Sequence, residues 1–235
     1  MSLLFLALAA SSLGAEETPR SDTWPLSDGK LTITFLGHGT LMLDYNGWVI
    51  HVDPVGAEAD YAALPPADLV LVTHEHGDHL DPKAVARITR PGTVIVANPA
   101  SAGKLPGALA LANGESRTVG AVKIEAVPAY NTTAGRNRFH PKGRDNGYVL
   151  TIADKRVYIA GDTEDIPEMK ALKNIDIAFL PMNQPYTMTP EQAAKAAQAF
   201  KPRVLYPYHF GDTDTGRLAE LLEGKSVEVR IRELQ

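Results

Sequence analysis

The chain has 235 residues, of which 44% are hydrophobic and 22% are charged, a composition typical of a globular protein with a full core. Its formal net charge of −5, without any basic run, argues against nucleic acid or an anionic membrane surface as the main partner. There is no cysteine, which excludes disulfides, thiolate metal sites and a cysteine nucleophile.

The N-terminus carries an apolar stretch from Leu3 to Ala10, followed by small residues and then by acidic sequence. This run is too short to span a bilayer and fits the core of a signal peptide, with the mature start near Ala15. No Lys or Arg precedes the run, so a frayed apolar terminus is the alternative. We predict a signal peptide over residues 1–14, an exported protein, and an N-terminal extension over residues 15–30. No later segment is long enough to cross a membrane.

Apolar runs predict strands along the rest of the chain, with helices between groups of them. An Asn-Gly turn at 46–47 joins two of the first strands, and the stretch 68–73 has a continuously apolar centre, as in a strand buried on both faces. A helix begins with the Asp-Pro pair at 81–82, and the clearest helix, 189–200, opens with a capping box. The predicted strands are 31–36, 41–45, 48–53, 68–73, 93–98, 122–127, 147–152, 156–161, 175–181 and 203–208, and the predicted helices are 82–90, 189–200 and 217–223. One α/β domain over 31–235, with two packed sheets and helices outside, accounts for this order.

The segment "LVTHEHGDHLDP" holds three of the seven histidines in the chain. His74 and His76 are two apart on an extended segment that leaves a strand, so both can point to the same side. The freedom of Gly77 at φ is expected to let the chain turn back and to bring Asp78 and His79 toward the first pair. Imidazole with carboxylate, without thiolate, suits Zn²⁺, Mn²⁺ or Fe²⁺. The spacing therefore favours a metal site over a solvated polar loop.

Two later strands also end in residues that can bind a metal. Asp162 follows one of them in "YIAGDTE", and His209 follows another in "YPYHFGD". Ligands gather in the loops at strand ends of α/β folds, so we expect both residues to lie near the histidine cluster.

The motifs "THEHGDH", "GDT" and "PYHFG" stand in the order and spacing of the metallo-β-lactamase superfamily, which the sequence resembles from about Leu31 to Arg230. The stretches "FLGHGTLML", "HPKGRDNGYVL" and "TMTPEQAA" resemble the branch that contains ascorbate-6-phosphate lactonase and related metal-dependent hydrolases. The resemblance implies an α/β fold, a four-layer αββα sandwich of two mixed sheets, with a dinuclear metal centre at the sheet edge. It identifies no substrate.

The resemblance also assigns residues to two metal positions. The first metal would be held by His74 and His76. The second would be held by Asp78, His79 and His209, with Asp162 bridging both positions. Asp78 and His79 are predicted as catalytic residues as well as ligands.

The third imidazole of the first position is where the chain departs from the common pattern. In many relatives this ligand follows the strand that ends here in "VPAYN", whose last residue is Asn131. An amide is a weak ligand for these metals, whereas His140, nine residues later, is an imidazole that could reach in from the loop. We predict His140 as the third ligand, with Asn131 as the alternative.

Other polar residues stand at the ends of predicted strands. His38, between two glycines, matches a histidine that the lactonase-like branch carries near the metals; contact with the site and a purely structural role are both open. His51 is expected to be a strand residue without chemistry. Asp53 ends that strand, where a carboxylate can accept a hydrogen bond from a ligand imidazole and fix its orientation. Tyr186 and Thr187 are candidates for substrate contact or for packing alone.

The predicted function is hydrolysis of an ester, lactone or phosphoester bond in a small-molecule substrate. Two divalent cations, zinc by expectation with manganese or iron as alternatives, would lower the pKa of a shared water and supply hydroxide as the nucleophile. No Ser-His-Asp set or G-x-S-x-G elbow is visible, so covalent serine catalysis is not needed. A metal-binding or di-iron redox protein of the same fold is the alternative, although it would normally need an acidic residue where His76 stands and a flavin partner domain.

Overall fold

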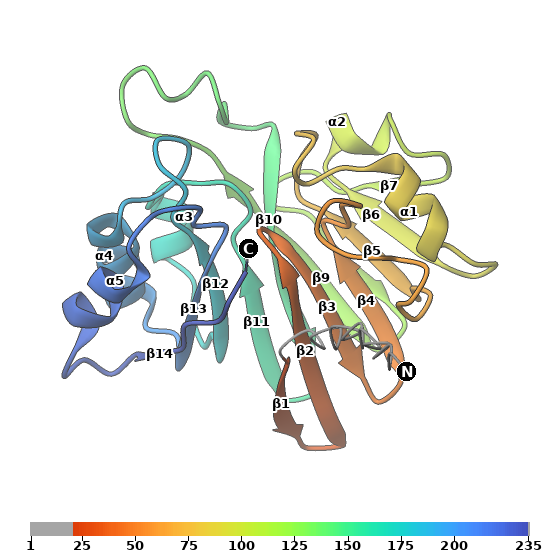
Figure 1. The fold of residues 1–235 in the computed structure, drawn as a ribbon, viewed down its shortest axis with the longest axis horizontal. Helices are drawn as coiled ribbons and strands as arrows, with labels where there is room; N and C mark the ends of the chain where they lie inside the picture. The colour runs from red at the N-terminus through yellow and green to blue at the C-terminus, as the bar shows by residue number, and fades with distance from the viewer. Residues whose placement is uncertain (1–20, 235) are drawn as a thin grey trace, which may run out of the picture.

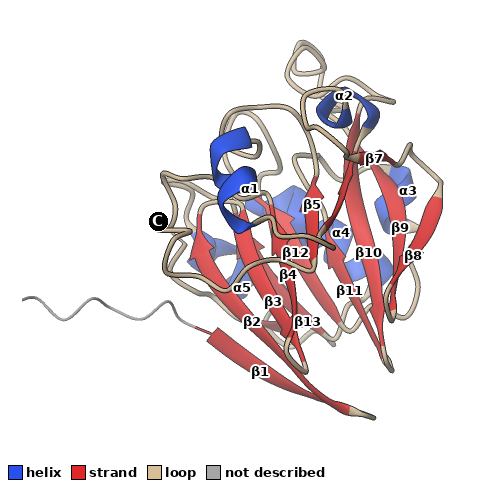
Figure 2. Ribbon diagram, turned by 90° about the vertical axis from the view of Figure 1, so that its right-hand side faces the viewer, coloured by secondary structure: helices blue, strands red, loops and turns tan. Residues whose placement is uncertain are grey.

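The computed structural model describes residues 21–234, whose strands form two seven-stranded sheets packed face to face (Figures 1 and 2). The first sheet contains, in spatial order, β1 (Ser21–Leu26), β2 (Gly29–Gly37), β3 (Thr40–Tyr45), β4 (Trp48–Val52), β5 (Leu69–Val72), β6 (Val94–Ala97) and β7 (Leu109–Ala110). The second contains β14 (Glu228–Val229), β13 (Val204–Tyr208), β12 (Ile177–Pro181), β11 (Lys155–Ile159), β10 (Asp145–Ile152), β9 (Val122–Ala129) and β8 (Ser116–Val119).

Both sheets are mixed in the same way. In the first sheet, the strands from β1 to β4 pair antiparallel and those from β4 to β7 pair parallel. In the second sheet, the strands from β8 to β11 pair antiparallel and those from β11 to β14 pair parallel. The carboxyl ends of the parallel strands therefore gather at a sheet edge, which is where α/β folds place their ligands.

Helices cover the outer face of each sheet, and their bounds are α1 (Pro82–Ile88), α2 (Pro99–Ala102), α3 (Pro167–Lys170), α4 (Pro190–Phe200) and α5 (Thr215–Leu222). On the first sheet, Val85 and Ile88 of α1 pack against Val70 and Val72. On the second sheet, α3, α4 and α5 bury their apolar faces in a separate cluster. The four-layer αββα sandwich predicted from the resemblance is therefore confirmed.

The main core lies between the two sheets and is built from alternate, inward-facing residues of the strands of both sheets. In β2 these are Leu31, Ile33 and Phe35, which follow the two-residue period of a strand. Phe35 packs against Tyr206, with 5.2 Å between ring centroids, and Tyr206 stacks on Phe179 at 5.1 Å. This apolar layer holds the two sheets in a fixed relation beneath the loops at their edge.

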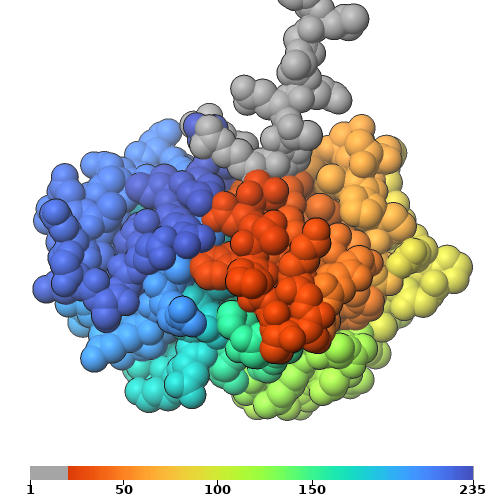
Figure 3. All heavy atoms as spheres, turned by 90° about the horizontal axis from the view of Figure 1, so that it is seen from below, coloured from red at the N-terminus to blue at the C-terminus, as the bar shows by residue number. Residues whose placement is uncertain are grey.

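The predicted strands and helices all have counterparts, and several shorter elements are additional. Residues 21–26 were predicted to lie in an N-terminal extension. They form β1, and all six pair with residues 29–34 of β2. Asp22 of β1 accepts hydrogen bonds from Arg232 near the other end of the chain, and Figure 3 shows these two ends side by side. The predicted signal peptide at residues 1–14 lies outside the described residues. Within 21–234, no helix has the length and apolarity needed to cross a bilayer.

Candidate metal centre

Loops from both sheets meet at one edge of the sandwich and bring the predicted ligands together. The histidine motif follows β5, and the long segment between β9 and β10, which rises above the sheets in Figure 1, supplies a further imidazole. The other two ligands follow β11 and β13. All the side chains predicted as ligands lie in this one place, namely His74, His76, Asp78, His79, His140, Asp162 and His209.

Three imidazoles form the first group of ligand atoms. His76 Nδ1 lies 3.3 Å from His140 Nε2, and the ligand nitrogens of these two residues and of His74 all lie within 4.8 Å of one another. Ligand atoms about 2.1 Å from a tetrahedral metal are roughly 3.4 Å apart. The nitrogens of His76 and His140 are therefore at the spacing of two ligands of one metal, and the nitrogen of His74 lies close enough to join them.

The second group contains two imidazoles and a carboxylate. His209 Nε2 lies 3.4 Å from Asp78 Oδ2, and His79 and His209 stack with 4.9 Å between ring centroids. The side chain of Asp78 is 47% exposed, whereas both imidazoles are buried. This group is therefore open to solvent on the side of Asp78.

Asp162 lies between the two groups and offers one carboxylate oxygen to each. Its Oδ2 is 3.3 Å from His140 Nε2 and 3.9 Å from His74 Nε2. Its Oδ1 is 3.3 Å from His79 Nε2 and 3.6 Å from His209 Nε2. This is the arrangement that a carboxylate shared by two cations requires.

Hydrogen bonds behind the site fix the tautomers of two imidazoles. The Thr73 hydroxyl donates to Asp53 Oδ2 at 2.6 Å, so its oxygen is free to accept from His74 Nδ1 at 3.0 Å. His79 Nδ1 donates to the same Asp53 oxygen at 2.8 Å. His74 therefore carries its proton on Nδ1 and directs the lone pair of Nε2 into the site, and His79, whose Nδ1 is likewise a donor, presents Nε2 to the site. The carboxylate of Asp53 lies where the sequence predicted it, whereas Thr73, directly before the motif, was overlooked.

Asn131 orients His140 and is itself turned away from the metal positions. Its Oδ1 accepts from the backbone N–H of His140 at 3.1 Å and lies 2.9 Å from His140 Nδ1. Its Nδ2 donates to the Tyr186 carbonyl at 2.7 Å. The ring of His140 therefore donates through Nδ1 and presents Nε2 to the site, in the same way as His74.

Arg144 supports the loop that carries His140, a role that the sequence analysis did not recognise. Its guanidinium donates to both carboxylate oxygens of the buried Asp145, at 2.7 and 2.9 Å, and to the Phe139 carbonyl at 2.9 Å. The Arg-Asp pair in "HPKGRD" is the signal that points to it. These contacts hold the end of the loop close to the start of β10.

The buried ligand atoms test whether the site fits a metal. His74 Nε2, His79 Nε2, Asp162 Oδ1 and His209 Nδ1 are buried, and none makes a hydrogen bond of acceptable geometry within residues 21–234. Buried polar atoms are almost always satisfied, and leaving one without a partner costs free energy. Three of these atoms face one another in the groups described above, so a cation between them would satisfy them. The donor set fits divalent metals.

Burial keeps two imidazoles of the first group neutral. It lowers the pKa of His74 well below its usual value and lowers the pKa of His140 to about 4. A neutral imidazole has a free lone pair, so both nitrogens can bind a metal at neutral pH without first losing a proton.

His79 and Asp162 form a buried ion pair when no metal is bound. Burial alone would raise the pKa of Asp162, but the charges of His209 and His79 hold it well below its usual value. Burial likewise opposes protonation of His79, but the carboxylates of Asp162 and Asp53 hold the pKa of His79 well above its usual value. A metal that binds here must displace the proton of His79.

The remaining candidate residues have varied positions. His38 Nε2 lies 3.4 Å from Asp78 Oδ2, so it belongs to the edge of the site. His51 is buried within β4, as its predicted strand position requires, and its Nε2 donates to the Pro65 carbonyl. Tyr186 is 43% exposed and packs edge-on against Phe139, whereas Thr187 is buried.

The expected role of Gly77 was wrong. Its φ is not in the left-handed region, and a Cβ added there would meet no atom within 4 Å. The turn is instead closed by the backbone N–H groups of His79 and Leu80, which both donate to the His76 carbonyl.

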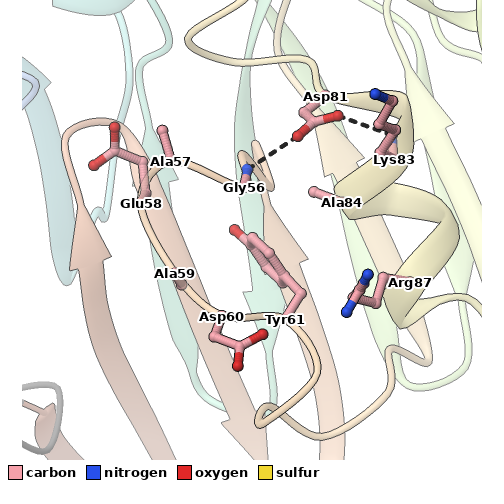
Figure 4. A pocket seen from close by; sticks show the side chains of 10 residues that line it. All are labelled: Gly56, Ala57, Glu58, Ala59, Asp60, Tyr61, Asp81, Lys83, Ala84 and Arg87. Atoms are coloured by element: carbon pink, nitrogen blue, oxygen red, sulfur yellow. Dashed lines mark hydrogen bonds between the residues drawn. The ribbon is translucent and has the colours of Figure 1, made fainter. Parts of the chain in front are cut away.

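A surface hollow of about 520 Å³ lies beside α1, apart from the histidine cluster (Figure 4). The loop 56–61 and the first turns of the helix line it. Its charged side chains are of both signs, and Asp81 is used within the fold, because it caps α1 and accepts from the Gly56 backbone at 3.1 Å. The hollow contains no histidine and joins no ligand group.

Comparison with known proteins identifies the family. A sequence profile described as "Beta-lactamase superfamily domain" matches residues 32–209, which is most of the chain and contains every predicted ligand. The chain belongs to the metallo-β-lactamase superfamily. The resemblance to the lactonase branch in particular stays a prediction.

Relatives within the superfamily agree with this assignment. A UPF0173 metal-dependent hydrolase of Thermococcus onnurineus is 35% identical over 191 residues, which are 76% of this chain and 84% of that protein. A crystal structure from Parabacteroides distasonis, described as a candidate metal-dependent hydrolase, has 57% identity and a TM-score of 0.91, over 93% of this chain and all of that one. A metallo hydrolase from Ignicoccus hospitalis, at 24% identity and a TM-score of 0.73 over 87% and 95% of the chains, shares the fold. These similarities support metal-dependent hydrolysis as the general function.

Proposed function

We propose that the chain is a hydrolase that holds two divalent metal ions, zinc by preference, and cleaves an ester, lactone or phosphoester bond. The observation that carries the proposal is the division of Asp162 between two groups of ligand atoms. One of its oxygens faces His74 and His140, and the other faces His79 and His209. The buried ligand atoms without a hydrogen-bond partner come from both sides of this division, namely His74 Nε2 on one side and His79 Nε2 on the other.

The chain supplies each position with protein ligands of the type that zinc prefers. The first metal would bind His74, His76 and His140. The second would bind Asp78, His79 and His209, and Asp162 would serve both. When bound, such a pair of cations lowers the pKa of water and polarises the bond under attack.

Asp78 is suited to orient the attacking water. Its Oδ2 lies 3.4 Å from His209 Nε2, whereas its Oδ1 makes no hydrogen bond within residues 21–234. In the metal-free protein, burial would raise the pKa of Asp78, but hydrogen bonds from His209 and His38 hold it far below its usual value, so the carboxylate stays ionised. Its free oxygen can accept a hydrogen bond from water on the solvent side and orient it.

The rim of the site suits a substrate with an apolar part. Phe139, directly before His140 in the same loop, packs edge to face with Tyr186, with 4.9 Å between ring centroids. The partly exposed ring of Tyr186 is free to contact a substrate group beside the reacting bond.

The di-iron redox alternative finds less support. It would normally need a carboxylate at the position of His76, whose Nδ1 instead faces the ligand nitrogen of His140. An all-imidazole first group suits Lewis-acid hydrolysis by zinc better than cycling between iron oxidation states.

The test is a substrate screen with matched variants. Protein loaded with zinc or with manganese is assayed on generic phosphodiester, lactone and carboxyl ester substrates. We expect turnover of at least one class and a loss of roughly 100-fold or more in Asp162→Asn, which keeps the shape but removes the shared charge. Glu191→Gln, an exposed carboxylate on α4, is the control and should keep full activity.

Two outcomes would contradict the proposed function. One is a folded, metal-loaded parent protein that turns over none of the three classes. The other is turnover that Asp162→Asn leaves unchanged, because the shared carboxylate would then have no part in the reaction.

A further inference from the structure

The turn between β2 and β3 presents an imidazole that the predicted ligand set does not use. His38 Nε2 lies 3.4 Å from Asp78 Oδ2, the same distance that separates His209 Nε2 from that oxygen. The rings of His38 and His209 lie side by side, with 3.8 Å between their centroids. The ligand atoms of these three residues lie within 4.8 Å of one another.

The backbone of this turn is shaped to direct His38 toward the site. The register of β2 shifts between Phe35 and Gly37, an irregularity of the kind that re-aims side chains at sheet edges. His38 has a φ of 45°, in the left-handed region that most residues avoid, and its carbonyl accepts from the His209 backbone N–H at 2.9 Å. Non-glycine residues held in this conformation cluster at functional sites, and His209 itself has the same φ.

Gly39 lets the turn approach the ligands closely. A Cβ at this position would lie 2.8 Å from His79 Cε1 and 3.3 Å from His209 Cδ2, distances at which the rings would have to move. A residue with a side chain would therefore push the turn, and His38 with it, away from the second metal position. The side chain of His38 is 22% exposed, so it closes part of the open side beside Asp78.

We propose that His38 is a further ligand of the second metal position and binds through Nε2. The inference rests on the proposed function, because it presumes a metal between Asp78, His79 and His209. Its Nε2 stands at ligand spacing from an ionised carboxylate oxygen, and neighbouring ligands of one metal are roughly 3.4 Å apart. The competing role is a hydrogen bond from His38 to Asp78, in which Nε2 carries a proton and binds no metal.

Nitrogen NMR of the zinc-loaded protein, labelled with ¹⁵N-histidine, separates the two roles. A ring nitrogen bound to zinc resonates apart from both a protonated and a free nitrogen, so coordinated rings can be counted. The chain has seven histidines, of which five belong to the predicted ligand set. We expect six coordinated rings, with one coordinated signal lost in His38→Gln, whose amide can still donate a hydrogen bond to Asp78. Chelator competition should show a loss of roughly 10-fold or more in second-site zinc affinity in that variant.

A turn variant controls for folding. Asn46 also has a left-handed φ, of 53°, in the turn between β3 and β4, so Asn46→Gln changes a matched position away from the site and should keep all six signals. Two bound zinc ions with a protonated His38 Nε2, or unchanged zinc affinity in His38→Gln, would overturn this inference and leave the proposed function standing. A parent protein that holds only one zinc would overturn both.

Discussion

Most ligand imidazoles in this protein have a hydrogen-bond partner at Nδ1, which leaves Nε2 facing the metal positions. Thr73 accepts from His74, Asp53 accepts from His79, and Asn131 faces His140. Asp53 could be predicted from the sequence because it ends a strand next to the motif. The role of Asn131 could not be predicted from the sequence. An amide is a weak metal ligand, and its hydrogen bond to His140 exists only after the loop between β9 and β10 has folded.

The first prediction separates these two residues. His140→Ala removes an imidazole, so the first position should lose its metal at concentrations that saturate the parent protein. Asn131→Ala keeps the imidazole of His140 but removes the hydrogen bond that orients it. We therefore expect the first position still to bind its metal, with an affinity loss of roughly 10-fold. Metal stoichiometry and chelator competition on both variants give the answer. If Asn131→Ala empties the first position while His140→Ala does not, the roles of the two residues are reversed.

The second prediction concerns protonation of the metal-free protein. Because the pKa of His79 is raised well above its usual value, we expect its ring to carry two protons at pH 7, whereas His140, with a pKa of about 4, should be neutral. The stabilisation from the His79 charge is complete below the unfolded-state pKa and is lost as the pH rises through the raised folded-state pKa. The apparent metal affinity of the second position should rise as the pH passes through the folded-state pKa of His79, because fewer His79 rings then carry a proton that the metal must displace. Nitrogen NMR of metal-free protein at pH 7 tests this; a neutral His79 would contradict it.

At the scale of elements, the strands that the sequence predicted are those with long apolar runs. The overlooked strands lie at sheet edges and carry little pattern: β7 and β14 have two residues each, and only the last residue of β8 is buried. In β1, exposed and half-buried residues alternate, and Pro25 and the half-buried Asp22 interrupt a pattern whose only buried-side apolar residues are Trp24 and Leu26. Such strands form because a neighbour offers hydrogen bonds, which is a tertiary effect that local sequence does not record.

The turn between β2 and β3 gives the third prediction. In Gly39→Ala the added methyl group would collide with His79 and His209, so we expect a loss of roughly 10-fold or more in second-site metal affinity with little change at the first site. Gly77→Ala is the matched control, since its methyl group would meet nothing within 4 Å. Affinities for both variants are measured by chelator competition. Equal affinities in the two variants would show that the close approach of Gly39 has no role.

At the scale of the whole molecule, the site exists only when both sheets are in place. Tyr148 of β10 donates to the Val72 carbonyl at 2.7 Å, and the Asn146 backbone N–H donates to the Thr73 carbonyl at 3.0 Å. These bonds join the second sheet to the end of β5, immediately before the histidine motif. Motif spacing could predict that distant residues converge, but not these cross-sheet contacts. Export through residues 1–14 stays a prediction.

The measurement that tests the account most directly is the metal content of the parent protein. The protein is purified gently, saturated with zinc or manganese, freed of excess metal and analysed for metal per chain. Because Asp162 offers one oxygen to each of two ligand groups, we expect close to two metals per chain. Asp162→Asn should fall below two under the same conditions, since it removes the charge that both positions share. At most one metal per chain in the folded parent protein would contradict the dinuclear centre.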